Sequence, residues 1–176
     1  SSSSAASDVY KRQVHTHLSE NKNEIAWVKE LFPERESYLD VYHHYGLTGS
    51  KSVFAHCVHL EDEEWDCMHQ TDSAIAFCPT SNLFLGSGLF PLKKTWDKGV
   101  KVGLGTDIGA GTSFNQLQTL NEAYKVQQLQ DEKLSAFEAL YHATLGGAKA
   151  LSLDDRLGNF NIGKEADLSL IHISEP

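Results

Sequence analysis

The feature that most constrains this 176-residue chain is a repeated alternation between short β-rich runs and longer segments with helical periodicity. The predicted strands cover residues 14–18, 52–58, 74–78 and 100–104. Such alternation is typical of strand–helix–strand units built around a parallel sheet. We therefore predict an α/β fold in which polar residues that follow the strands meet at the carboxyl edge of the sheet.

The helices are predicted from the spacing of apolar residues between these runs. The first opens near Asn23 and should bury a stripe formed by Ile25, Trp27, Val28 and Leu31. Further helices are predicted over residues 38–45, 61–68, 89–98, 115–130 and 135–151. Pro79 is expected to end the third strand.

Charge and cysteine content exclude several classes of partner. The chain has 24 acidic and 15 basic residues and a formal net charge of −9, which disfavours nucleic acid and anionic membrane surfaces. No apolar run approaches the ~18 residues of a membrane-spanning helix. Cys57, Cys67 and Cys78 form no C-x-x-C pair, so we expect neither a disulfide framework nor a zinc ribbon, and a cytoplasmic location.

The first strand ends in the sequence His15-Thr16-His17-Leu18-Ser19-Glu20. Strand alternation places His15 and His17 on one face, and Glu20 follows at the turn after the strand. An imidazole and a carboxylate can therefore share one pocket. We interpret His17 and Glu20 as functional residues and His15 as a structural one.

The other three strands also end in polar residues. His56 follows the small residue Ala55 in the second strand, whereas His59 lies at the loop edge and is interpreted as structural. Ser81 and Asn82 follow the third strand, where they could face a ligand or form a capped turn. The acid Asp107 emerges from the fourth strand among glycines, and a buried acid is costly unless a cation pairs with it.

Histidines and carboxylates at successive strand ends form a plausible metal and acid/base site. With imidazole and carboxylate ligands and no paired thiolates, zinc is the leading candidate, followed by iron or another divalent metal. Such a metal would lower the pKa of a bound water toward neutrality. Glu20 is then placed to carry protons.

Four motifs, HTHLSE, FAHCVH, AFCPTSN and VGLGTD, occur in the order and approximate spacing of the metal-dependent amidohydrolase superfamily, which the chain resembles from residue 14 to residue 168. SNLFLGSGLF, GTDIGAG and QTLNEAYK are most similar to its guanine deaminase branch. The resemblance implies that His17 and Asp107 are metal ligands and that His56 contacts and orients the water. It further implies that Asp107 takes the proton of the water and that Glu20 passes protons to the purine ring nitrogen and the departing amine.

The resemblance also implies a substrate and its contacts. The expected reaction is hydrolytic deamination of guanine to xanthine and ammonia, with Glu20, Ser81 and Asn82 at the purine. One alternative is another amidohydrolase deaminase or chlorohydrolase acting on a different aminated heterocycle. A second alternative is an inactive fragment without catalysis.

The fold implied by the resemblance is the carboxyl-terminal half of a (β/α)8 TIM-type barrel, truncated at the start of a small β-sandwich. Residues 14–157 would be the partial barrel and 158–168 the return to the β-sandwich, with 1–13 and 169–176 non-native or disordered. The H-x-H of the family's first strand, which supplies two further ligands, is absent from this chain. We therefore expect activity only in a full-length parent, as a homodimer, and weak metal binding by this chain alone.

Overall fold

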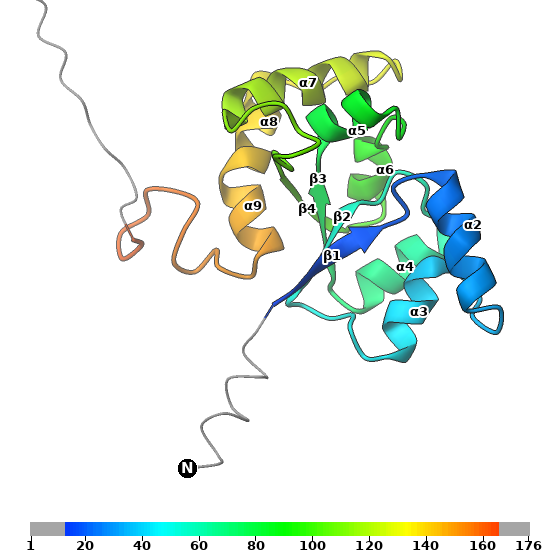
Figure 1. The fold of residues 1–176 in the computed structure, drawn as a ribbon. Helices are drawn as coiled ribbons and strands as arrows, with labels where there is room; N and C mark the ends of the chain where they lie inside the picture. The colour runs from blue at the N-terminus through cyan, green and yellow to red at the C-terminus, as the bar shows by residue number, and fades with distance from the viewer. Residues whose placement is uncertain (1–12, 166–176) are drawn as a thin grey trace, which may run out of the picture.

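The computed structural model describes residues 13–165, so the predictions for residues 1–12 and 166–176 lie outside the described residues. Within it, four strands form one parallel sheet in the order β1-β2-β3-β4 (Figure 1). They are β1 (Val14–Leu18), β2 (Ser52–His56), β3 (Ala74–Phe77) and β4 (Lys101–Leu104). The predicted α/β class with parallel strands is confirmed, and β1 and β4 are the edge strands of the sheet that the structure describes.

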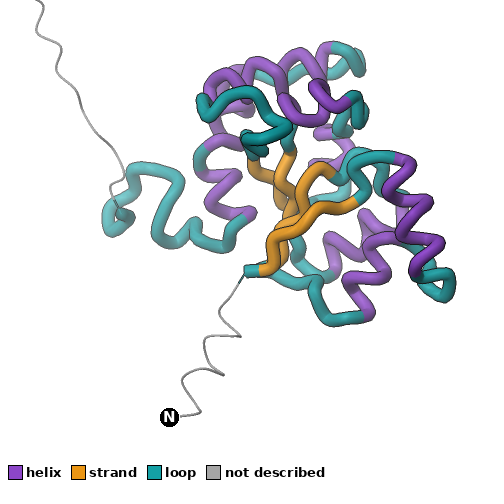
Figure 2. Tube along the Cα trace, viewed as in Figure 1, coloured by secondary structure: helices purple, strands orange, loops and turns teal. Residues whose placement is uncertain are grey.

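Eight helices surround this sheet in the described part of the chain (Figure 2). They are α2 (Lys22–Leu31), α3 (Tyr38–His44), α4 (Asp62–Gln70), α5 (Pro79–Leu85), α6 (Leu92–Asp97), α7 (Gln116–Gln128), α8 (Ala136–Ala143) and α9 (Leu145–Ala150). Side chains cap several of their amino ends. Asn21 accepts a hydrogen bond from Glu24 N at the start of α2, and Ser135 forms a capping box with Glu138 at the start of α8.

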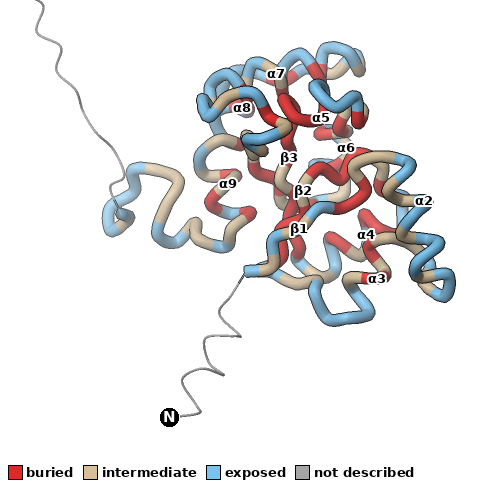
Figure 3. Tube along the Cα trace, in the orientation of Figure 1, coloured by how far each residue is buried: buried red, intermediate tan, exposed pale blue. Residues whose placement is uncertain are grey.

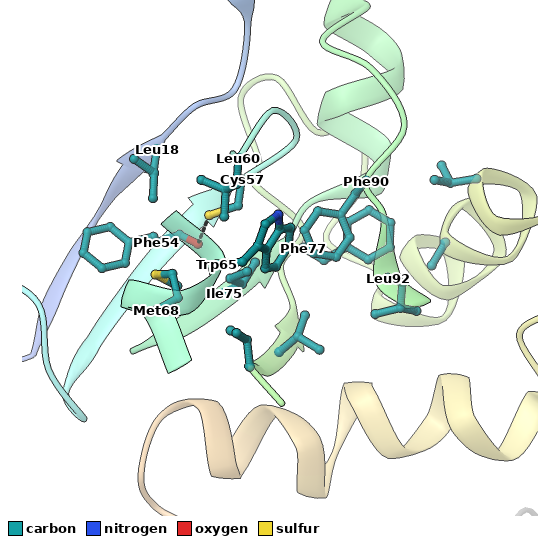
Figure 4. Packing of buried hydrophobic residues seen from close by; sticks show 14 of the residues in the cluster. Leu18, Phe54, Cys57, Leu60, Trp65, Met68, Ile75, Phe77, Phe90 and Leu92 are labelled. Atoms are coloured by element: carbon teal, nitrogen blue, oxygen red, sulfur yellow. Dashed lines mark hydrogen bonds between the residues drawn. The ribbon is translucent and has the colours of Figure 1, made fainter. Parts of the chain in front are cut away.

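The main core lies between one face of the sheet and the helices that cover it (Figure 3). Alternate strand residues supply the sheet side, among them Phe54, Ile75 and Phe77, all at most 1% exposed. Trp65 of α4 and Phe90 pack against them (Figure 4). Each such buried side chain contributes about 1.5–3 kcal/mol to folding, so this layer fixes the strands that carry the polar residues.

Helix α9 lies on the other face of the sheet, across from α4 in Figure 1. Val53 and Ala74, which alternate with Phe54 and Ile75, form a second buried cluster with Ala150 of α9. A Cβ atom at Gly103 would lie 2.9 Å from Gly147 Cα, so strand β4 and α9 approach too closely for a larger side chain.

Helix α2 departs from the predicted packing. Trp27 and Leu31 are 62% and 56% exposed, Ile25 and Val28 are only half-buried, and the helix has no fully buried residue. The buried stripe predicted for this helix is therefore wrong. Helical spacing identified the helix, but spacing does not show how much of the apolar stripe the described residues cover.

The helices differ from the prediction in three further places. The third strand stops before Pro79 as predicted, but Pro79 also begins α5, a helix that the sequence pattern did not predict. Proline is well suited to the first turn of a helix, whose N–H groups have no partner within the helix. The helix predicted over 135–151 is two helices, since Thr144 has a non-helical backbone (φ −127°, ψ −99°). The helix predicted over 89–98 is limited to α6.

Residues 158–165 form turns, and the remainder of the predicted return to a β-sandwich lies outside the described residues. Among the described helices, none is long and apolar enough to cross a membrane.

His142 of α8 forms hydrogen bonds with both β4 and α6. Its Nδ1 donates to Val102 O of β4 at 3.2 Å, and its Nε2 accepts from Trp96 Nε1 of α6 at 3.1 Å. This arrangement needs the neutral ring, because a proton on Nε2 would face the N–H of Trp96. Burial lowers the pKa of His142 below its ordinary value of 6.5.

We expect this buried imidazole to make stability fall in mild acid. The unfolded chain binds a proton at His142 near pH 6.5, whereas the folded state resists it, so the free energy of unfolding declines as pH drops below 6.5 toward the lowered pKa of the folded state. Denaturant unfolding should show a smaller decline for His142→Gln than for the unsubstituted chain. The control is His44→Gln at an exposed histidine; equal declines in all three proteins would contradict this role of His142.

Candidate active site

Strand β1 presents His17 and Glu20 at its carboxyl end. His17 is exposed on the sheet face that alternates with the buried Leu18, and its carbonyl accepts a hydrogen bond from Tyr42 Oη at 3.1 Å. Glu20 begins the turn into α2, where its backbone N donates to Glu24 Oε2 at 3.0 Å. These two contacts fix the backbone of both residues.

Left-handed backbone conformations occur where three of the strands end. Ser19, His56 and Asp107 have φ values of +47°, +71° and +46°. Such conformations cost non-glycine residues of order 1–3 kcal/mol each and cluster at functional sites. Here they turn the chain sharply after β1, β2 and β4, next to the residues predicted to be functional.

The structure brings His17, His56 and Asp107 together. Each offers one ligand atom, and the three atoms lie within 4.8 Å of one another. The rings of His17 and His56 are stacked, with centroids 5.3 Å apart and an interplanar angle of 8°. The expectation that side chains from different strand ends converge is met for these three residues.

His56 is the buried centre of the cluster, with 1% of its side chain exposed. Its Nδ1 lies 2.8 Å from Asn82 Oδ1, and because that oxygen accepts, Nδ1 carries the proton. Nε2 then presents a lone pair between two carboxylates, 3.8 Å from Glu20 Oε2 and 3.9 Å from Asp107 Oδ2. It has no hydrogen-bond partner among residues 13–165.

The loop after β4 holds Asp107 through a close backbone approach. Gly111 N donates to Asp107 O at 2.6 Å, and a Cβ atom at Gly111 would lie 1.8 Å from Thr106 O. Only glycine fits there, which explains part of the glycine-rich sequence after Asp107.

The residues of the cluster fit a divalent cation. Two imidazoles and a carboxylate are ligands that suit zinc and other first-row metals. The two carboxylates beside the buried, unpartnered Nε2 of His56 form no ion pair with a lysine or arginine among the described residues. The structure thus groups His56 with His17 and Asp107, whereas the sequence assigned it to the water.

The metal-ligand cluster does not include four other residues of this region, His15, His59, Ser81 and Cys78. His15 is exposed on the face it shares with His17, and His59 Nε2 donates to Ser87 O at 2.8 Å, a structural contact. Ser81 is fully buried, with its hydroxyl unpartnered among the described residues. Burial raises the pKa of Cys78 to about 12, so its thiol is not a nucleophile at neutral pH.

Sequence reasoning missed two contacts of this site. Ser87 Oγ donates to Glu20 Oε1 at 2.8 Å, from the loop after α5. Asn82 was considered as a ligand contact or as part of a capped turn, yet its side-chain oxygen accepts a hydrogen bond from His56. Ser87 lies 67 residues from Glu20 in sequence, and Asn82 lies 26 residues from His56. Local sequence patterns do not reveal contacts at such separations.

Comparison with known proteins gives consistent results. Residues 2–175 match the amidohydrolase family. Guanine deaminase of Escherichia coli is 73% identical over 154 residues, which make up 88% of this chain and 35% of that protein. Its solved structure is similar with a TM-score of 0.87, covering 88% of this chain and 36% of that one. This chain therefore spans about a third of that curated relative.

Two other solved structures are also similar. Guanine deaminase from C. acetobutylicum, solved with guanine bound in its active site, is 36% identical with a TM-score of 0.82, covering 90% of this chain and 39% of that one. An adenosine deaminase from Xanthomonas campestris, solved with bound zinc, is 28% identical with a TM-score of 0.83, covering 93% and 38%.

We expect the 176-residue chain to bind one Zn²⁺ weakly at this cluster, measured by calorimetric titration. His17→Gln and Asp107→Asn each remove a ligand and should abolish the binding. Asn82→Ala removes only the support of His56 and should weaken it by about 10–100-fold. His15→Gln changes an exposed histidine on the same strand face and is the matched control. Equal binding by the His15 and His17 variants would contradict the assignment.

Proposed function

This chain belongs to the amidohydrolase family, and we propose that it forms part of a longer enzyme that deaminates guanine to xanthine and ammonia. The observation that carries the proposal is the position of His56 Nε2, buried and unpartnered among the described residues between the carboxylates of Glu20 and Asp107. The identity to E. coli guanine deaminase supports guanine as the substrate.

We assign the metal to His17 and Asp107, with His56 beside them. When bound, a divalent cation, proposed to be zinc, supplies Lewis acidity that makes water reactive at neutral pH. The zinc found in the related adenosine deaminase supports this choice. Asn82 keeps the proton of His56 on Nδ1, so that Nε2 can accept a hydrogen bond and orient the attacking water.

The two carboxylates divide the proton transfers. The oxygen of water bonds to the ring carbon that bears the amino group, and Asp107 takes one proton from that water. Glu20 gives its proton to the ring nitrogen, takes the remaining proton of the added hydroxyl and passes it to the departing amine, so that the carbon–nitrogen bond breaks and ammonia leaves. The proton held by Asp107 then returns to Glu20, which restores both carboxyl groups. Glu20 suits this role because 14% of its side chain is exposed and its Oε2 faces His56.

Substrate contacts and assembly extend the same proposal. Ser81 and Asn82 are candidates for lining the purine pocket, since Ser81 Oγ and Asn82 Nδ2 are buried and unpartnered among residues 13–165. We place the longer protein in the cytoplasm as a homodimer, with iron or another divalent metal as the alternative to zinc. A second substrate class, another aminated heterocycle, is favoured by the structural similarity to the adenosine deaminase.

A chimera tests the function. Residues 14–165 of this chain would replace the matching segment of E. coli guanine deaminase, to which the chain is 73% identical. We expect the chimera to release ammonia from guanine and the isolated 176-residue chain to release none, because the chain offers too few metal ligands alone. A panel of adenosine and aminotriazines separates the substrate classes, and preference for one of these would refute guanine as the substrate.

Two substitutions in the chimera test the proton transfers. Glu20→Gln and Asp107→Asn should each lower kcat by about 10²–10⁴-fold, the usual cost of losing a proton-transfer group. Glu30→Gln makes the same chemical change at an exposed position on α2 and should leave kcat unchanged. Near-normal turnover by either active-site variant would remove that residue from the mechanism.

A further inference from the structure

We infer that Ser87 is a positioning residue that fixes the plane of the Glu20 carboxylate, so that one of its oxygens faces the reacting groups. The inference rests on the proposed deaminase function, because it concerns the orientation of the same carboxylate. Ser87 lies in the connection between α5 and α6, outside every strand end that supplies the site. It is 67 residues from Glu20 in sequence, and its side chain points at that residue in the fold.

With the hydrogen bond from Ser87 in place, the two oxygens of Glu20 face different groups. Oε1 accepts the hydrogen bond from Ser87 Oγ at 2.8 Å. Oε2 lies 3.8 Å from His56 Nε2, on the side of the metal ligands. A carboxylate without this bond can rotate about its last torsion angle, which is soft and nearly two-fold symmetric. The hydrogen bond from Ser87 therefore fixes the angle of the carboxylate plane, with one oxygen on Ser87 and the other toward His56.

Ser87 is itself held firmly by neighbours of the site. Its backbone N donates to Asn82 O at 2.8 Å, and its carbonyl accepts from His59 Nε2 at 2.8 Å. Only 8% of the residue is exposed. The next residue, Gly88, has φ +133°, and a Cβ atom built on it would lie 2.9 Å from Val58 Cγ1. Glycine is therefore the residue that fits this position of the loop.

The same segment also supports His56. Asn82, five residues before Ser87, uses its side-chain oxygen on His56 Nδ1 and its backbone carbonyl on Ser87 N. One short stretch of chain thus orients both an imidazole and a carboxylate that come from separate strands. A neutral donor is suited to this task, because it supports the carboxylate without the charge of a lysine or arginine that would compete with a metal ion.

The test uses the chimera and measures kcat and KM for guanine. Ser87→Ala should lower kcat by about 10- to 100-fold, the scale expected when a reacting group is misplaced by about 1 Å, with KM little changed. Ser87→Thr keeps the hydroxyl and should recover most of kcat. Ser73→Ala is the matched control. It removes a buried serine hydroxyl just before the amino end of β3, away from the site at the carboxyl end, and should keep full kcat.

A double-mutant cycle separates positioning from a general structural role and does not depend on how well threonine fits. With Glu20→Gln in place, Ser87→Ala should cause no further loss of kcat, because the orientation of the reacting carboxylate no longer matters. Equal losses in both backgrounds, or an unchanged kcat in Ser87→Ala alone, would overturn the inference. If the unsubstituted chimera does not deaminate guanine, the proposed function fails instead, and the two failures are thereby distinguished.

Discussion

The site depends on two carboxylates being held within 4 Å of one buried imidazole nitrogen. Two like charges beside a lone pair repel one another, and because the side chains of Glu20 and Asp107 are 14% and 30% exposed, solvent screens that repulsion only in part. The arrangement persists because other parts of the fold bind each group: Asn82 holds His56, and Ser87 holds Glu20. The unsatisfied charge is what a cation would neutralise, so the same geometry that is costly without a cation is organised to receive one.

The apolar core is what sustains this arrangement. The left-handed residues at the strand ends cost of order 1–3 kcal/mol each. Behind them, Phe54, Phe77 and Trp65 are fully buried, and each contributes about 1.5–3 kcal/mol. Packing of the core therefore offsets the backbone strain at the carboxyl edge of the sheet. In a loosely packed sheet the turns would relax and the side chains of the site would move apart.

The strands and the convergence of His17, His56 and Asp107 were predictable because period-2 patterns and strand-end positions are local properties of the sequence. The exposure of Trp27 and the break at Thr144 were not, since both depend on which surfaces meet in three dimensions. Helix α5 was missed because a proline after a strand is compatible with a turn as well as with a helix start. The contacts of Asn82 and Ser87 join distant segments, and only coordinates reveal such pairs.

The residues of the site come from two parts of the fold that differ in how freely they can vary. His17, His56 and Asp107 come from strand ends, whose positions are fixed by the parallel register. Asn82 and Ser87 come from the segment between β3 and α6, which reaches the same groups from outside the sheet. An adenosine deaminase and an atrazine chlorohydrolase, each 28% identical to this chain, share the described fold. A loop can change shape without disturbing the sheet, so the connection from α5 to α6 can vary, and with it the orientation of Glu20, while His17, His56 and Asp107 stay in place.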